Sequence, residues 1–208
     1  EDVASYKVTK KWDLGKDIKN AKAVLPEYIT VQLQYSEDGE DWKDLPKGGE
    51  IKLKAEKISD NEVVWETYTW KNLRSNLKYR AVEVSATWTV DGKEKTVYVK
   101  DDKGTEVKAE KGTLGSFEYT SESDYTEKGD VKAYTTVLTN KLPDTEFTVT
   151  KIWDDSNNVD KLRKEVTVNL YMDKTASSAP VATVVLNEAN NWTYTWKNLP
   201  MYANGSDT

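Results

Sequence analysis

The amino-acid sequence predicts an all-β protein made of two tandem β-sandwiches with antiparallel strands, the second of them truncated. The chain holds 12 Tyr and 8 Trp against 2 Phe and 2 Met, and aromatic and β-branched residues favour the pleated, half-buried surface of a sheet. Apolar and polar residues alternate over many short runs, whereas the periodicity of amphipathic helices is poor. Several sequence strings also recur in the same order in both halves of the chain. These three features together indicate repeated β-domains.

Turn dipeptides separate the alternating runs. Asp91-Gly92 is the strongest of them, because alternating runs flank it on both sides as a hairpin requires. Residues 16–23 fit no more than one helical turn. The strands are predicted, in chain order, at 6–12, 29–35, 67–73, 79–85, 87–90, 96–100 and 135–140.

Internal repetition is the main feature of the sequence. Val8–Asp13 returns with one change as Val149–Asp154, and Tyr68–Leu73 returns unchanged as Tyr194–Leu199. The separation between matching strings falls along the chain, so the first copy must carry insertions.

The repeats define the predicted domains. We expect a complete domain with insertions at residues 1–143. Residues 144–208 then form the N-terminal part of a second domain, because the second copy has no counterpart of residues 79–140.

The composition excludes several kinds of chemistry. The chain has no Cys and no His, which excludes disulfides, thiolate nucleophiles and His-dependent triads or metal sites. Its net charge is −6, and Arg is scarce, so we expect no nucleic-acid partner. The sequence shows no membrane span and no signal peptide, and we interpret it as an excised mature fragment. A polar loop at 154–160 resembles a calcium loop, but Val159 replaces the glycine of the sharp turn, so we expect no metal.

One lysine falls on an apolar face. Side chains two residues apart in a strand share a face, so Lys10 lies with Val8 and Trp12, which mark the core side. Lys151 takes the equivalent position in the second copy. An unpaired buried ammonium costs several kcal/mol and must be paired or neutralised.

The same parity places Glu83 beside Tyr79 and Asn140 beside Leu138. Simpler interpretations stay open from the residues alone. A strand-end lysine can extend its ammonium to solvent, a mid-strand glutamate can lie on a solvated face, and Asn140 can mark the end of a strand.

The ordered strings resemble a known family. Val-Thr-Lys-x-Trp-Asp, Tyr-Thr-Trp-Lys-Asn-Leu, Tyr-x-x-x-Glu and Thr-Val-Leu-Thr-Asn-Lys, in that order, are similar to the CnaB-type domains of Gram-positive surface adhesins and pilins. Residues 147–202 match closely. The first domain matches at its start, middle and end, with divergent insertions at about 36–64 and 86–132. The resemblance implies Ig-like, CnaB-type sandwiches.

The resemblance also implies a cross-link. Such domains form an intramolecular isopeptide bond between a Lys on the first strand and an Asn on the last, assisted by an acid on a middle strand. By position, Lys10 matches the reactive Lys, Asn140 the reactive Asn and Glu83 the catalytic carboxylate. Lys151 is the candidate cross-link lysine of the second domain, whose acid and Asn would lie beyond the sequence. No cofactor is expected, and the reaction occurs once per fold, so the protein is not an enzyme.

The function implied is that of a structural stalk segment in a cell-surface adhesin or pilus-like protein. The expected location is extracellular and cell wall-anchored. Its partners would be neighbouring domains of the same adhesin and, through other regions, host extracellular matrix. The alternative is an extracellular β-sandwich module that binds a carbohydrate or a host protein, for example through exposed Trp side chains.

Overall fold

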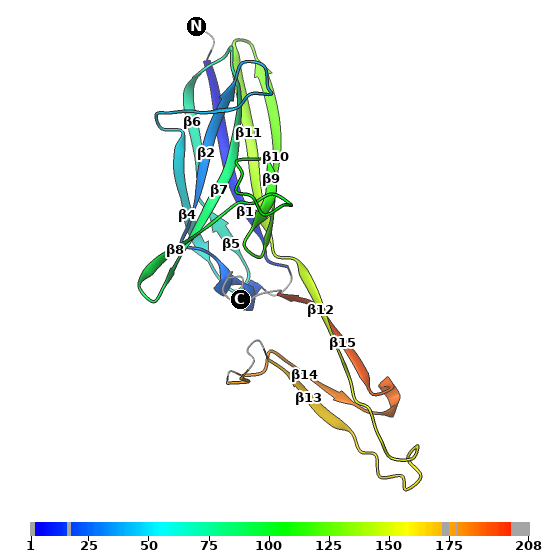
Figure 1. Cartoon of the computed structure of the whole chain (residues 1–208). Helices are drawn as coiled ribbons and strands as arrows, with labels where there is room; N and C mark the ends of the chain where they lie inside the picture. The colour runs from blue at the N-terminus through cyan, green and yellow to red at the C-terminus, as the bar shows by residue number, and fades with distance from the viewer. Residues whose placement is uncertain (1–2, 16–17, 172–174, 178, 201–208) are drawn as a thin grey trace. The chain divides into compact units, whose positions relative to one another are not determined.

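The computed structural model describes residues 3–15, 18–171, 175–177 and 179–200. Nearly all of its regular structure is strand, which confirms the predicted all-β class. The chain divides into two compact units between Pro143 and Asp144, coloured from blue to yellow-green and from yellow to red in Figure 1. The assignment of residues 1–143 as a complete domain and 144–208 as part of a second stays a prediction.

The first unit contains a sheet of five strands. Its central members are the first and last strands of the unit, with the others added on either side (Figure 1). In spatial order the strands are β6 (Thr67–Arg74), β1 (Val3–Asp13), β11 (Val131–Lys141), β10 (Phe117–Lys128) and β9 (Lys111–Leu114).

A second sheet of six strands supplies the other layer of the first unit. The predicted hairpin at Asp91-Gly92 joins two of its strands, and both residues have positive φ, 52° and 73°, as the twist of a two-residue hairpin loop requires. In spatial order the strands are β5 (Val63–Trp65), β4 (Glu50–Ile58), β2 (Tyr28–Ser36), β7 (Lys78–Val90) and β8 (Lys93–Tyr98), with β3 (Lys43–Asp44) paired to β2.

Two short helical turns connect β1 to the second sheet. They are α1 (Ile18–Ala21) and the 3₁₀ turn η1 (Lys22–Val24). They overlap residues 16–23, where one helical turn is predicted, and residues 16–17 lie outside the described residues. Trp88 Nε1 donates a hydrogen bond to the carbonyl of Val24 at 3.0 Å. That contact fastens the turn to β7.

One strand pair departs from the expected antiparallel pattern. β1 and β11 pair in parallel, from Val3↔Val131 to Asp13↔Lys141, while the other strand pairs between described residues are antiparallel. Parallel neighbours need a long connection, and here nearly the whole first unit separates them. The first and last strands of the unit therefore run side by side in one direction.

The core of the first unit lies between its two sheets. Val8 and Leu138 of the five-stranded sheet and Ile29, Val31 and Leu33 of the six-stranded sheet are fully buried, and they belong to one continuous cluster. Exposed and buried residues alternate along β1, with Val8, Lys10 and Trp12 turned inward. The unit is thus a β-sandwich, as predicted.

The second unit, described by itself, contains two pairs of antiparallel strands. One pair is β12 (Asp144–Thr150) with β15 (Thr193–Pro200), and the other is β13 (Val166–Leu170) with β14 (Ala182–Leu186). A 3₁₀ turn, η2 (Glu188–Asn190), precedes β15. Several apolar side chains of this unit are exposed in the described residues, among them Phe147, Ile152 and Leu162.

The two copies of the sequence repeat form the same strand pair. Val8 stands opposite Tyr68 on β1 and β6, and Val149 stands opposite Tyr194 on β12 and β15. A register shift interrupts both ladders at the equivalent place, just before Tyr6 in the first unit and Phe147 in the second. Because register fixes which side chains face inward, the repeated strings encode the same local structure twice.

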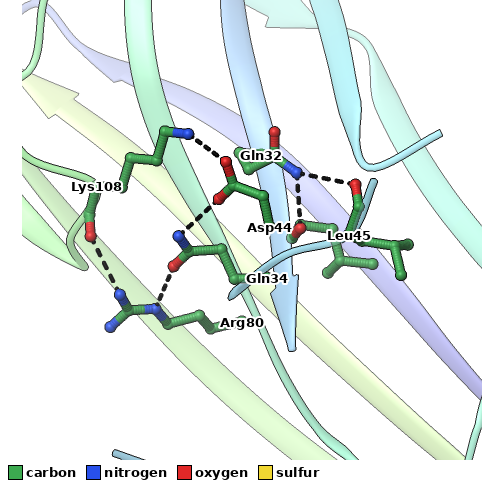
Figure 2. Close-up of polar contacts among 7 residues, drawn as sticks. Gln32, Gln34, Asp44, Leu45, Arg80 and Lys108 are labelled. Atoms are coloured by element: carbon green, nitrogen blue, oxygen red, sulfur yellow. Dashed lines mark hydrogen bonds and ion pairs between the residues drawn. The ribbon is translucent and has the colours of Figure 1, made fainter. Parts of the chain in front are cut away.

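A polar network fastens the first inserted segment to the outer face of the six-stranded sheet. Gln34 of β2 lies between Asp44 of β3 and Arg80 of β7 (Figure 2). Its Nε2 donates to Asp44 Oδ1 at 2.9 Å, and its Oε1 accepts from Arg80 Nε at 2.8 Å. Lys108 closes the circuit, because its ammonium pairs with Asp44 and its carbonyl accepts from Arg80 at 3.1 Å.

Gln32 extends the same polar surface. Its Nε2 donates to the carbonyls of Leu33 at 2.8 Å and Leu45 at 3.4 Å (Figure 2). Both glutamines are buried, at 4% and 5% exposure for Gln32 and Gln34. Buried amides with satisfied partners hold β3 and the segment around Lys108 against β2 and β7.

Replacing Gln34 by Ala should lower the free energy of unfolding of the first unit by about 1–3 kcal/mol. The substitution leaves buried polar partners without their hydrogen bonds. Urea denaturation followed by Trp fluorescence measures the change. Glu37→Ala, an exposed substitution on the same segment, is the control and should change it little. Equal losses in the two variants would contradict the role assigned to the network.

Candidate functional site

Three polar side chains from three strands meet inside the first unit. Lys10 comes from β1, Glu83 from β7 and Asn140 from β11. Lys10 Nζ lies 3.7 Å from Glu83 Oε1, and Asn140 Nδ2 donates a hydrogen bond to Glu83 Oε2 at 2.8 Å. The three residues are 4%, 0% and 0% exposed. The structure therefore brings together the three residues that the sequence singled out in the first domain.

Strand register explains the meeting. On the parallel pair, Lys10 stands opposite Leu138 and Trp12 stands opposite Asn140. Lys10 and Asn140 are thus two positions apart along neighbouring strands and share the inward face. Glu83 approaches them across the core from β7, in the opposite sheet.

Lys10 is enclosed by backbone carbonyls and an aromatic ring. Its Nζ donates to the carbonyl of Lys11 at 2.6 Å and to that of Leu138 at 3.4 Å, and it lies 4.0 Å from the centre of the Trp12 ring. Burial lowers the pKa of Lys10 from 10.5 to about 8, against the opposing effect of the Glu83 carboxylate. The neutral form of the Lys10 amine is therefore much more populated here than it is for a lysine on the surface.

Glu83 is fully buried, and burial raises its pKa above the ordinary value of 4.5. Lys10 and the Asn140 amide oppose this rise. Glu83 Oε1 and Asn140 Oδ1 accept no hydrogen bond within the described part of the chain. A neutral acid next to a neutral amine is the arrangement that desolvation favours in such a pair.

Aromatic residues surround the site. Trp12 packs against Trp65 at 5.3 Å and against Phe117 at 5.0 Å between ring centres, and each of the three is buried. Water is thereby kept from the amine, the acid and the carboxamide. The simpler interpretations, in which Lys10 reaches solvent or Glu83 lies on a solvated face, are wrong, because both side chains have no exposed surface.

Lys151 lies in a different setting. It precedes Trp153 as Lys10 precedes Trp12, and its Nζ lies 4.6 Å from the centre of the Trp153 ring. The residue is only half-buried. Among the described residues it makes no ion pair with a carboxylate. Within the described ranges, this second candidate lysine thus lacks the ion-paired acid that Lys10 has.

The described residues were also compared with the requirements of a metal site and of a membrane span, and they meet neither. In the described ranges, no group of acidic residues is arranged so that it could hold a metal ion. No helix within those ranges has the length and apolar character needed to cross a membrane.

Comparison with known proteins supports the family resemblance. The family model described as the Cna protein B-type domain matches residues 147–208. Over those residues the chain is similar to the CnaB-type family. The resemblance drawn from the sequence is thereby confirmed.

Relatives extend the similarity beyond that CnaB-type segment. A collagen adhesin from Staphylococcus aureus is 32% identical over 203 residues, which cover 93% of this chain. The chain spans 17% of the length of that relative. The crystal structure of two B repeat units of the collagen-binding protein of Staphylococcus aureus is 23% identical and covers 99% of this chain and 67% of its own, with a TM-score of 0.27. At that TM-score the match carries no argument, and the fold rests on the sheets described above.

The sequence did not predict that Trp65 and Phe117 pack around the site. Trp65 borders the insertion at about 36–64, and Phe117 lies within the one at about 86–132. Both insertions differ from the family strings, so no motif marked these two residues. The alternation of Phe117 and Tyr119 around an exposed Glu118 is the signal that identifies an inward-facing strand here.

The buried pair predicts a pH dependence in a chain that cannot form the cross-link. Burial lowers the pKa of Lys10 from 10.5 to about 8 in the folded chain. We expect the same direction in Asn140→Ala, because the burial of Lys10 is its main cause, so the unfolded state binds more protons between these values. The free energy of unfolding should therefore rise with pH across this window, by about 3 kcal/mol in total. Denaturation at several pH values measures the slope.

Asn140→Ala combined with Lys10→Met is the control for titration of all other groups. The raised pKa of Glu83 acts in the opposite sense, since the folded state keeps a proton that the unfolded state releases above 4.5. A slope between pH 8 and 10.5 that is the same with and without Lys10 would refute the assigned pKa.

Proposed function

We propose that the first unit forms an intramolecular isopeptide bond between Lys10 and Asn140, assisted by Glu83, and that the chain is a stalk segment of a Gram-positive cell-surface adhesin or pilus-like protein. The observation that carries the proposal is the buried contact of an amine, a carboxyl group and a carboxamide from three different strands. The CnaB-type match and the similarity to a collagen adhesin support it.

The chemistry balances without a cofactor. The neutral Nζ of Lys10 attacks Cγ of Asn140, since an amine is nucleophilic and an ammonium is not. A new C–N bond forms, and the bond from Cγ to Nδ2 breaks. The proton displaced from Nζ passes through the Glu83 carboxyl group to Nδ2, which leaves as ammonia.

The geometry suits each proton transfer. Glu83 Oε1 faces Lys10 Nζ at 3.7 Å, and Oε2 faces Asn140 Nδ2 at 2.8 Å. One oxygen thus lies beside the nitrogen that loses a proton and the other beside the nitrogen that gains it. Holding both reactants against one carboxyl group supplies effective molarity that offsets roughly 7–11 kcal/mol of the barrier.

The strand arrangement suits a load-bearing role. Because β1 and β11 run parallel, tension applied to the two ends of the first unit loads both strands along their length. A bond between Lys10 and Asn140 would carry that tension from β1 directly to β11. The residues between them would then bear no load.

The bond would also stabilise the fold in the absence of force. It closes a loop that contains most of the unit, and loop closure of this size removes about 5 kcal/mol of chain entropy from the unfolded state. The chain has no Cys with which to make a disulfide of the same kind.

Further parts of the proposal concern the whole protein. Residues 1–143 form a complete CnaB-type domain and residues 144–208 the start of a second, whose reactive lysine is Lys151. The partners are neighbouring domains of the same adhesin and, through other regions, host matrix. The location is extracellular, at the cell wall. Cross-linking occurs once in each domain, so the protein is not an enzyme.

Intact mass spectrometry tests the cross-link. We expect the purified chain to weigh less than its encoded mass by one ammonia, because one C–N bond replaces another and Nδ2 leaves. Lys10→Met and Asn140→Ala lack a reactant and should keep their full mass, while Lys11→Met, an exposed neighbour, should still lose ammonia. A full-mass wild-type chain, or a loss of ammonia that persists in Lys10→Met, would contradict the proposal.

Glu83→Gln should fold yet keep its full mass, and cross-linking in that variant would show that Glu83 is not the acid.

Single-molecule stretching tests the load path. The wild-type chain should release less contour length than Lys10→Met when pulled from its two ends, because residues 11–139 stay behind the covalent bond. The second unit contributes equally in both chains and cancels in the comparison. Equal contour lengths would contradict a role for the bond in bearing tension.

A further inference from the structure

Among the described strands, none pairs with the β8 side of β7 before Ser85. β8 pairs with β7 only from Ser85 to Val90. Nearer the start of β7, two backbone N–H groups donate to side chains instead. Ala81 N–H donates to Tyr6 Oη at 2.9 Å, and Glu83 N–H donates to Tyr119 Oη at 3.1 Å. Both phenols come from the five-stranded sheet, so they link the two layers.

Both tyrosines lie in the core. Each is 1% exposed, and burial raises the pKa of each phenol above its ordinary value of 10. The hydroxyl groups therefore stay neutral at any physiological pH. Each can accept the backbone N–H in a region from which water is excluded, where such a bond is stronger than at the surface.

Tyr119 is placed between two members of the proposed cross-link. On the β10–β11 ladder it stands directly opposite Asn140. Its hydroxyl holds the backbone of Glu83. One rigid side chain thus connects the strand that carries the carboxamide to the residue that carries the acid.

The backbone of β7 needs such a restraint at this point. The β2–β7 ladder is interrupted here, with Thr30 opposite Ser85 but Val31 opposite Glu83. Val84 is consequently an extra residue, and a bulge lies immediately beside Glu83. A bulge locally disrupts the ladder, so pairing with β2 fixes Glu83 less firmly than it fixes Ala81, which stands opposite Leu33 in the regular part.

We infer that Tyr119 is a positioning residue for the Lys10–Asn140 cross-link. It sets the place of Glu83 so that one carboxyl oxygen reaches Lys10 and the other reaches Asn140. The inference rests on the proposed function, since it assigns a role within that reaction. It does not make Tyr119 a catalytic residue, because the hydroxyl contacts the backbone of Glu83 and none of the reacting atoms.

Tyr6 provides a matched comparison. It is the same residue type, equally buried, and it holds an N–H of the same strand two residues away. Its hydroxyl also shares a hydrogen bond with Thr136 Oγ1. Tyr6→Phe therefore removes a comparable buried contact without releasing the backbone of Glu83.

The test is the rate of cross-linking in Tyr119→Phe and Tyr6→Phe. The whole chain is synthesised by cell-free translation and quenched in acid at intervals, and intact mass spectrometry gives the fraction that has lost ammonia. Circular dichroism and thermal melts of the uncross-linked Lys10→Met background, with and without each substitution, give the folded fraction. The rates are then expressed per folded molecule.

We expect Tyr119→Phe to slow the reaction by roughly tenfold or more, since small misplacements of a catalytic group cost about that much or more. Tyr6→Phe should slow it less than about threefold, although both lower the melting temperature to a similar extent. Equal slowing in the two variants, or a wild-type rate in Tyr119→Phe, would overturn the positioning role and leave the cross-link intact. A wild-type chain that never loses ammonia would overturn the cross-link and the positioning role together.

Discussion

The removal of Lys10 and Glu83 from water is the constraint on which the first unit depends. An isolated ammonium or carboxylate in the core carries a penalty of several kcal/mol. The two groups lower that penalty by lying 3.7 Å apart and by shifting their pKa values toward the neutral forms, with burial as the main cause for each. The same shifts favour a neutral amine and a neutral acid over an ion pair. The burial that costs stability is thus what the proposed cross-linking reaction would depend on.

This constraint explains why the groups around Lys10 and Glu83 hold both residues at defined positions. Backbone carbonyls of Lys11 and Leu138 receive the Lys10 amine, and the aromatic rings around Trp12 exclude water. Tyr119 fastens the backbone of Glu83 across the two sheets. Each of these contacts holds a polar group at a defined place within an apolar core, where an error in position would leave that group unsatisfied.

The parallel alignment of β1 with β11 connects the site to mechanics. It puts Lys10 and Asn140 on the same face, two positions apart, at the end of β11 that leads out of the unit. A covalent bond there would lie close to where the chain leaves toward β12. The second unit repeats the first-strand pairing, including its register shift, but its half-buried Lys151 has no such surroundings in the described residues.

The sequence by itself determined the β class, the repeats, the hairpin at Asp91-Gly92 and the inward direction of Lys10, since these depend on local alternation, turn chemistry and strand parity. Parity also placed Glu83 beside Tyr79 and Asn140 beside Leu138 but left a solvated face open for Glu83, and the family strings grouped both residues with Lys10. Only the tertiary structure decided that Glu83 contacts both Lys10 and Asn140, because contact depends on which strands become neighbours and in what register. The sequence likewise could not predict the parallel β1–β11 pair, the bulge beside Glu83 or the hydrogen bond from the backbone of Glu83 to Tyr119. They join residues far apart in the chain, and no local pattern encodes the distance between two sheets.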